Sequence, residues 1–296
     1  MVEAHAFRAR RTGDANMGAT LHRRLGPWGS ILPGLLMLVG LYVYPLVGVL
    51  WISVTEPHVG LGNYARLFSD PAVDHVLWTT LRIGVITTAV SLVLGYLVAY
   101  SMVQGSRRPR QWMLICVLLP FWISVLARAF AWVTLLRTGG LINTTLLSLG
   151  LIRAPLELLY NEVGVVVGMV HYMLPLAVLT LYANMRGIDR RLVIAARGLG
   201  ATRWGAFRRV FLPLSLPGIV AAGTLVFIFS LGFFITPAIL GGGKTLMVAE
   251  FISVMLTETL DWGLGTMLAS LLMLAVLLLL ALLSRVVDLR RLFGAA

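Results

Sequence analysis

Cysteine, lysine and acidic residues are all scarce in this chain. One cysteine, Cys116, stands among 296 residues, so the chain has neither a disulfide framework nor a cysteine-based metal site. Charged residues make up 12% of the sequence, about half the share typical of soluble domains, whereas 59% are hydrophobic and the mean hydropathy is +0.91. The apolar residues also come in long blocks, which predicts an all-α membrane protein and not a soluble domain.

Six apolar blocks are long enough to cross the hydrocarbon core of a bilayer as helices, which takes roughly 20 residues. They lie at 31–54, 77–103, 113–136, 163–184, 218–240 and 264–284. Three of the intervening loops, 55–76, 137–162 and 241–263, each have room for a short helix, and 246–262 carries apolar residues at helical spacing. We therefore expect an N-terminal tail (1–28), a transmembrane domain (29–286) and a C-terminal tail (287–296).

The basic residues are distributed unevenly between the two sides of the predicted bundle. Eighteen of the 24 lie in the N-terminal tail, in loops 104–112 and 185–217, and at the C-terminal end from Arg285 onward, whereas most acidic residues lie in the other loops. Because cytosolic loops carry an excess of arginine and lysine, both termini are predicted to be cytosolic. This bias also accounts for the net charge of +12, so membrane lipids, and not nucleic acid, are the expected partners of these arginines. The polar first 28 residues show no cleavage site of a signal peptide.

The longest basic loop, 185–217, is predicted to form two helices joined by a turn. Asp189 is a plausible N-cap of the first helix, which Gly198 and Gly200 would end. Thr202 would cap the second helix and Pro213 would end it.

The first of these helices has an unusually smooth face. Leu192, Ala195, Ala196 and Leu199 share one side of it, and the two alanines leave a low ridge that a partner surface can approach closely. The alternative is an ordinary amphipathic helix that rests on anionic lipid headgroups.

The order of residues in this loop resembles the EAA loop of bacterial ABC importer permeases. That family's pattern is Glu-Ala-Ala-x3-Gly with an aromatic residue and a proline downstream; here Ala195-Ala196 precedes Gly200-Ala201, Phe207 and Leu212-Pro213. The stretch 63–71 resembles the family's first outer loop, and 119–122, 139–143 and 234–242 resemble the spermidine/putrescine permease branch. The family's glutamate is replaced by Ile194, so a contact through that carboxylate cannot form here.

The resemblance implies a type I ABC importer permease fold of about six transmembrane helices, with a cytosolic coupling loop at 185–217 and a place in a bacterial inner membrane. The implied partners are two cytosolic ABC ATPases, a second permease that is a paralogue or a copy of this chain, and a periplasmic or lipid-anchored substrate-binding protein. ATP and magnesium would be held by the ATPases, so this chain is expected to be neither an enzyme nor a cofactor carrier. The residues expected to dock the ATPase are Ala195, Ala196, Arg197, Gly198, Gly200, Ala201, Phe207 and Pro213.

A glycine-rich stretch at 241–245 looks like a phosphate loop but does not fit one. The required first glycine is Ala238, and the stretch falls on the predicted outer face. None of the five histidines forms a pair with metal-ligand spacing, and we expect His171 to be a hydrogen-bonded residue of the fourth span and not a proton relay.

Under the same resemblance, the solute is a small amine such as putrescine or spermidine. The candidate pathway residues are Trp122, Arg128, Glu162, Tyr172, Phe233, Phe234, Glu258 and Asp261. Glu250, Glu258 and Asp261 could share an acidic face at the pathway mouth, although acids gather on the outer side of any such topology. Arg82 and Arg128 either face the bundle interior or reach the headgroups.

Three other functions stay open at this point. A permease of the same family could import another small amine or an organic anion. A stand-alone channel or secondary carrier is less favoured, because no internal repeat of spans is visible. A membrane scaffold with a lipid-bound basic loop would need no ATPase.

Overall fold

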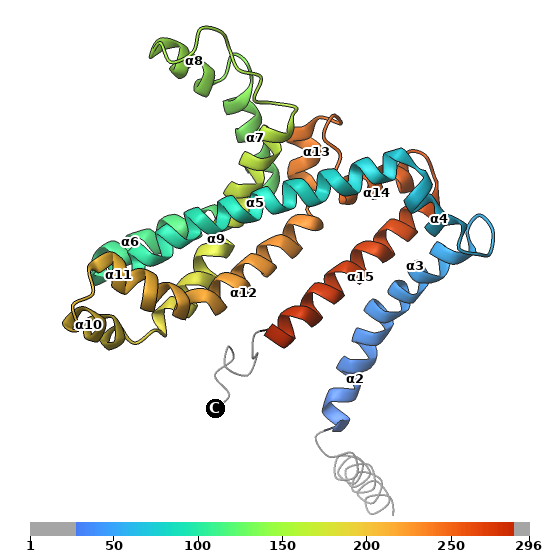
Figure 1. Ribbon diagram of the computed structural model, residues 1–296. Coiled ribbons are helices and arrows are strands. Elements are labelled where there is room, and N and C mark those ends of the chain that lie inside the picture. The colour runs from blue at the N-terminus through green and yellow to red at the C-terminus, as the bar shows by residue number, and fades with distance from the viewer. Residues whose placement is uncertain (1–27, 287–296) are drawn as a thin grey trace, which may run out of the picture. The chain divides into compact units, whose positions relative to one another are not determined.

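The computed structural model describes residues 28–286, and the regular structure of this part of the chain is entirely helical (Figure 1). The chain divides into two compact units, 1–52 and 53–296. The described part of the first unit contains α2 (Trp28–Leu38), the π turn η1 (Val39–Val43) and most of α3 (Tyr44–Thr55). The predicted tails 1–28 and 287–296 lie almost entirely outside the described residues.

The second unit holds the other helices. In chain order they are α4 (Gly62–Ser69), α5 (Pro71–Gln104), α6 (Arg107–Leu118), the 3-10 turn η2 (Leu119–Trp122), α7 (Val125–Leu136), α8 (Leu141–Ser148), α9 (Glu162–Arg186), α10 (Arg190–Gly198), α11 (Arg203–Ala206), the π turn η3 (Phe207–Phe211), α12 (Leu212–Leu231), α13 (Ile235–Gly241), α14 (Val248–Thr257) and α15 (Trp262–Val286).

Six helical segments of the described chain are long and apolar enough to cross a membrane. They are Ile31–Thr55, Pro71–Gln104, Val125–Ser148, Glu162–Arg186, Arg203–Leu231 and Trp262–Ser284. The predicted first, fourth and sixth spans are confirmed to within two residues, and the second is confirmed except that its helix begins six residues earlier, at Pro71. The short helices expected in the three long loops are also confirmed, as α4, α8 and α14.

The prediction of one continuous helix over 113–136 is wrong. Helix α6 ends at Leu118, the 3-10 turn follows, and Ile123 is extended before α7 begins at Val125. Pro120 explains the break, because proline has no N–H for the helical ladder and its ring clashes with the preceding turn. The apolar span here consists of α7 and α8 instead.

The prediction of a helix over 218–240, and of an end at Pro213, is also wrong. Helical structure runs without a gap from Arg203 to Leu231, and Pro213 lies within it. The π turn directly before this proline, in which the Leu212 N–H bonds the Phe207 carbonyl, widens the ladder where the proline N–H is missing. The chain turns at Gly232, so α13 is a separate helix.

Helices α5, α9 and α12 form the centre of the second unit and lie against one another (Figure 1). Small residues let them approach closely, as membrane helices commonly do. At Gly95 of α5, an added Cβ would lie 3.0 Å from the Cβ of Ala177 on α9. Met173 and Ala177 of α9 pack with Val226 of α12 in the middle of this core.

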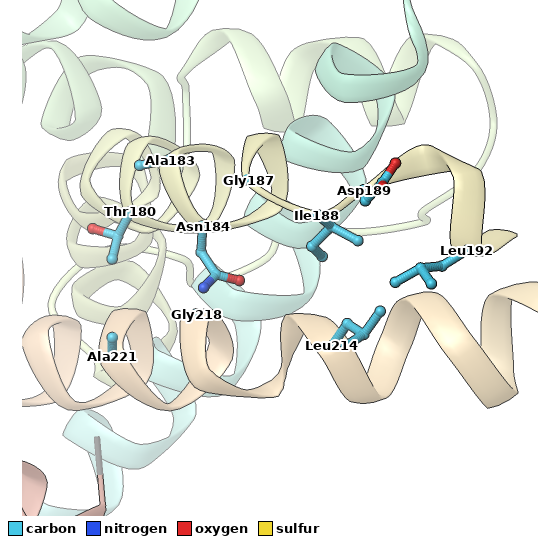
Figure 2. Close-up of a pocket in the computed structure, with 10 residues that line it drawn as sticks. All are labelled: Thr180, Ala183, Asn184, Gly187, Ile188, Asp189, Leu192, Leu214, Gly218 and Ala221. Atoms are coloured by element: carbon cyan, nitrogen blue, oxygen red, sulfur yellow. The ribbon is translucent and has the colours of Figure 1, made fainter. Parts of the chain in front are cut away.

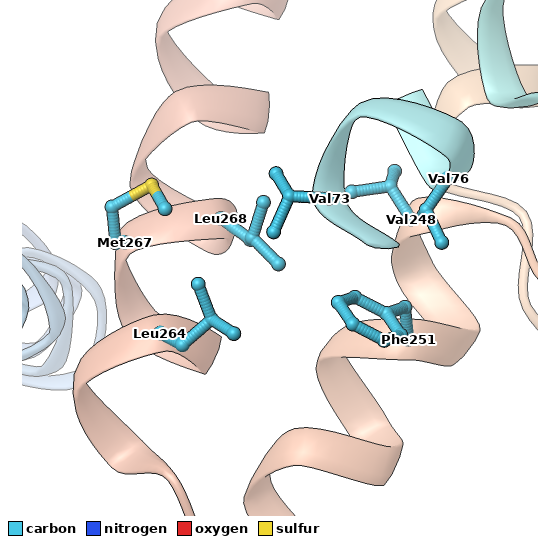
Figure 3. Close-up of a cluster of buried hydrophobic side chains, with 7 residues drawn as sticks. All are labelled: Val73, Val76, Val248, Phe251, Leu264, Met267 and Leu268. Carbon is cyan, nitrogen blue, oxygen red and sulfur yellow. The ribbon is translucent and has the colours of Figure 1, made fainter. Parts of the chain in front are cut away.

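Helix α14 covers the end of this bundle at the start of α5. Its Val248 and Phe251 pack with two valines of α5 and with three apolar residues of α15 (Figure 3). The buried set is Val73, Val76, Val248, Phe251, Leu264, Met267 and Leu268. A hydrogen bond from the Val248 N–H to Thr80 Oγ1, 2.8 Å long, fixes the start of α14 on α5.

Candidate functional site

The loop that joins α9 to α12 is a compact helical hairpin with capped ends. Asp189 Oδ1 accepts a 2.9 Å hydrogen bond from the Arg191 N–H at the start of α10. The hairpin turns at Gly200, whose φ is +90°, a conformation that favours glycine. Thr202 Oγ1 then accepts a 3.0 Å bond from the Gly205 N–H at the start of α11. The predicted caps and turn are confirmed, and they stabilise the ends of the two short helices.

One side of α10 is apolar and exposed. Leu192 and Leu199 on this side are 49% and 90% exposed, and Ala195 is exposed between them. Ile194, 66% exposed, lies on a different side of the helix, beside Arg197. Ala196 is half-buried. We call the face made by Leu192, Ala195, Ala196 and Leu199 the alanine ridge. A short capped helix with an uncovered apolar side can seat in a groove of another protein.

Aromatic side chains attach the second half of the hairpin to α5. The Phe207 ring lies 5.3 Å from the Tyr100 ring and 6.2 Å from the Tyr96 ring, both edge-to-face, and 5.3 Å from the Trp204 ring, stacked. Phe211 packs edge-on to Tyr100 at 5.1 Å. The sequence grouped Phe207 with the docking residues, but its ring points inward and ties the hairpin to the end of α5.

The remaining docking candidates lie in three places. Arg197 borders a hollow of about 420 Å³ together with Arg190, Arg203 and Ile194. Gly198 and Ala201 lie at the hairpin turn, where the Ala201 N–H bonds the Ala196 carbonyl. Pro213 is exposed on α12, away from the turn.

A second hollow, of about 820 Å³, runs between the ends of α9 and α12 beside the hairpin (Figure 2). Small residues on both helices make room for it: Ala183, Gly187, Gly218 and Ala221. The Asn184 amide points across this hollow toward Gly218 (Figure 2). Sequence reasoning missed this feature, and the only available signal was the run of small residues facing one another on two separate helices.

Three of the predicted pathway residues come together beside α13. The Arg128 guanidinium carbon lies 4.6 Å from the centre of the Tyr172 ring, and the Phe233 ring lies 4.5 Å from the same ring. Arg128 is only 9% exposed, so it faces the interior. Within residues 28–286 no carboxylate pairs with it, and its clearest favourable partner is the face of Tyr172.

The neighbouring residues complete this cluster. Trp132 Nε1 donates a 3.0 Å hydrogen bond to His171 Nδ1, and both side chains border a small cavity with Arg128 and Tyr172. The expected hydrogen-bonded state of His171 is confirmed. Trp122 and Phe234 are 90% and 42% exposed and have no ring partner in the described part of the chain.

The predicted acidic residues do not form one face. Glu162 pairs with Arg82, whose side chain is 42% exposed. Arg82 is therefore a partly exposed, paired arginine, whereas Arg128 is buried. Glu258 is exposed, whereas Glu250 is buried, and burial raises the pKa of the Glu250 carboxyl to about 7. The expectation of a shared acidic face is therefore wrong.

Asp261 is held in an ion pair with Arg66, with Nη1 and Oδ2 2.7 Å apart. Burial alone would raise the pKa of Asp261, but the hydrogen bonds from Arg66 and the Leu264 N–H, together with the Arg66 charge, bring the pKa below its ordinary value. Arg66 also approaches Asp70 at 3.7 Å. The Asp261 carboxylate therefore links α4 to the start of α15 through its ion pair with Arg66.

The stretch 241–245 forms the turn between α13 and α14. Gly242 and Gly243 have φ of +57° and +73°, which end α13 and reverse the chain. Across residues 28–286, no group of three or more histidine, cysteine, aspartate or glutamate side chains gathers in a way that could hold a metal ion.

Comparison with known proteins identifies relatives over most of the chain. Residues 91–292 match the family described as binding-protein-dependent transport system inner membrane component. The spermidine/putrescine transport system permease protein PotB of Haemophilus influenzae is 35% identical over 238 residues, which cover 78% of this chain and 83% of that protein. The PotB protein of Escherichia coli is 34% identical over 236 residues, with 77% and 86% covered.

A solved structure supports the same architecture. A chain of a bacterial ABC transporter involved in the import of the acidic polysaccharide alginate superposes with a TM-score of 0.73. The match covers 91% of this chain and 99% of that one at 18% sequence identity, which is evidence for the fold alone.

Proposed function

The chain belongs to the family of binding-protein-dependent transport system inner membrane components, and from this membership we propose that it forms half of the translocation pathway of a polyamine importer driven by two partner ATPases. As a family member it is a permease subunit of a transporter complex and a multi-pass inner membrane protein. The proposal adds the substrate, the partners and the orientation. Both termini and the hairpin would face the cytosol, as the arginine excess in these segments favours.

The observation that carries the ATPase proposal is the exposed alanine ridge on a hairpin that is otherwise tightly anchored. The ridge would seat in a groove of the ATPase, with Ile194 adding apolar contact where the family pattern has glutamate. Arg197, Gly198, Gly200 and Ala201 would border this contact, whereas Phe207 anchors the hairpin. ATP and magnesium would stay on the ATPase.

The continuous helix from Arg203 to Leu231 suggests how motion reaches the pathway. Displacement of α10 is passed to α11, and α11 continues through the π turn into α12 without a flexible joint. The Phe207 ring couples the same displacement to α5 through Tyr100. A rigid element of this kind can convert the closure of two ATPases into a switch between two states of the membrane helices.

The polyamine part of the proposal rests on the relatives and on the aromatic cluster. Two PotB proteins named for spermidine and putrescine are 34–35% identical to this chain. The Tyr172 face already holds a guanidinium, and aromatic faces bind alkylammonium groups by the same electrostatic attraction. Another small amine or an organic anion is the alternative solute; a second permease and a substrate-binding protein would complete the complex.

Docking is tested by co-purification of the permease with its ATPases. Ala196→Arg and Ala195→Arg place a long charged side chain on the ridge and should reduce ATPase recovery at least tenfold. Ala154→Arg makes the same chemical change at an exposed position in the loop between α8 and α9 and is the matched control. Normal recovery with both ridge variants would rule out the docking role.

The substrate is tested on the complex reconstituted in liposomes with its binding protein. Putrescine or spermidine should stimulate ATP hydrolysis and drive their own uptake, whereas an organic anion such as citrate should do neither. Uptake by the permease alone without ATP would instead support a channel or secondary carrier.

A further inference from the structure

Four arginines converge on a cavity of about 590 Å³ where α5 and α9 end and α6 and α10 begin. Arg110 comes from α6, Arg186 from the last residue of α9, and Arg190 and Arg191 from the start of α10. Arg110 and Arg186 are separated by more than a whole membrane hairpin in sequence, so the fold and not local sequence brings them together.

The positive charge of this cavity is largely uncompensated. Asp189 is the only acidic residue among those that line it, and its carboxylate already caps α10 by accepting from the Arg191 N–H. None of the four arginines takes part in an ion pair within residues 28–286. Four guanidinium groups around one hollow repel one another, and an anion that accepts several hydrogen bonds would relieve this repulsion.

The walls of the cavity indicate where the anion comes from. Val103, Tyr182 and Ile188 supply an apolar side, and Val103 and Tyr182 lie near the ends of two membrane spans. Tyrosine at a span end marks the level of the lipid headgroups, and basic pockets between transmembrane helices bind anionic headgroups. The volume of about 590 Å³ falls within the range of small-ligand sites.

We propose that this cavity binds the phosphodiester headgroup of an anionic phospholipid of the phosphatidylglycerol class. The phosphate oxygens accept from the guanidinium groups, and the glycerol backbone and acyl chains leave along the apolar wall. The bound headgroup connects α6 to the junction of α9 and α10, so the lipid steadies the base of the hairpin. The alanine ridge residues do not line the cavity, so this site is separate from the proposed docking face.

The test uses the full-length permease alone, without ATPase or substrate, so its result does not depend on the proposed import function. The protein is purified in detergent, and binding of phosphatidylglycerol and of phosphatidylcholine is measured by native mass spectrometry and by the shift in thermal unfolding midpoint. The wild-type protein should retain phosphatidylglycerol selectively. Arg110→Gln combined with Arg186→Gln should weaken its apparent affinity at least tenfold, since each contacting arginine contributes roughly fivefold.

The matched control is Arg208→Gln combined with Arg209→Gln, which removes the same charge from exposed positions on the π turn that do not line this cavity. It should leave the affinity within about twofold of wild type. Equal weakening in both double variants, or no preference for phosphatidylglycerol over phosphatidylcholine, would overturn the proposal. Protection by millimolar inorganic phosphate equal to that by the lipid would also overturn it, because the source would then be a free anion.

A second double variant distinguishes loss of the binding site from loss of the folded structure. Arg110→Lys combined with Arg186→Lys keeps the charge but loses the planar fork that binds two phosphate oxygens at once. It should bind with an affinity between those of the wild-type protein and the glutamine variant. Binding as weak as that of the glutamine variant, in a protein that keeps its helical circular dichroism, would contradict a site that depends on positive charge.

Discussion

Replacement of Phe207 by alanine should separate ATPase docking from the transmission of motion. The Phe207 ring joins the hairpin to α5 through edge-to-face contacts with Tyr100 and Tyr96 and stacks on Trp204. Truncation of a fully buried phenylalanine costs about 3–5 kcal/mol, and a half-buried one costs roughly half of this. The nearer of the two ring contacts with α5, the edge-to-face pair with Tyr100, adds about 0.5–1.5 kcal/mol. We therefore expect the attachment of the hairpin to weaken by about 2–4 kcal/mol.

A loss of this size changes the population of loosened hairpins by roughly 30- to 1,000-fold, because each 1.4 kcal/mol is a factor of ten. The alanine ridge is untouched, so the ATPases should still co-purify with Phe207→Ala. Substrate-stimulated ATP hydrolysis and uptake in liposomes should fall by at least tenfold. Trp204→Ala is the control, since this residue is 67% exposed and its ring packs, within residues 28–286, against Phe207 alone, so its effect should be several times smaller.

Two results would refute the reasoning. Unchanged uptake by Phe207→Ala would mean that the aromatic contacts do not carry the motion. Loss of ATPase binding as complete as that of Ala196→Arg would mean that docking and anchoring are not separate.

Three further predictions concern stability. Asn143 is fully buried and bonds both the N–H and the carbonyl of Leu156, so Asn143→Ala should loosen the loop between α8 and α9 by about 2–3 kcal/mol, measured as faster hydrogen exchange there; unchanged protection would contradict this role. Burial raises the pKa of Glu250 from 4.5 to about 7, so its ionised form lowers stability progressively between these pH values, by at most about 3 kcal/mol above pH 7. Glu250→Gln should therefore raise the thermal midpoint at pH 8 and leave it unchanged near pH 4.5; no gain at pH 8 would count against the burial argument. The lowered pKa of Asp261 means that its pair with Arg66 stabilises at neutral pH and is lost as the pH falls below about 3.8. Asp261→Asn should cost less than about 1 kcal/mol at pH 7, because the pair is partly exposed, and the difference from wild type should shrink progressively as the pH is lowered below 3.8.

The hairpin shows which features of a loop can be predicted from residues close together in the sequence. Its caps at Asp189 and Thr202 and its turn at Gly200 were predictable, because each depends on residues only a few positions apart. The inward direction of Phe207 was not, since it depends on Tyr96 and Tyr100, which lie more than 100 positions earlier.

The effect of a proline on a helix is a second feature that the sequence did not predict correctly. Pro120 breaks a helix and Pro213 does not, although both lie in apolar stretches. The difference comes from the π turn before Pro213, which widens the ladder at the missing N–H; no residue pattern announces such a turn.

By itself, the sequence determined the membrane class, the number of spans and the residues that can form the ridge, because long apolar blocks and capped short helices are local properties. Only the tertiary structure decided which charges meet. It placed Arg128 on Tyr172, joined Arg66 to Asp261 and gathered four arginines around one cavity. Such pairings depend on helix packing across long sequence separations, and the one-dimensional pattern of charges carries no record of them.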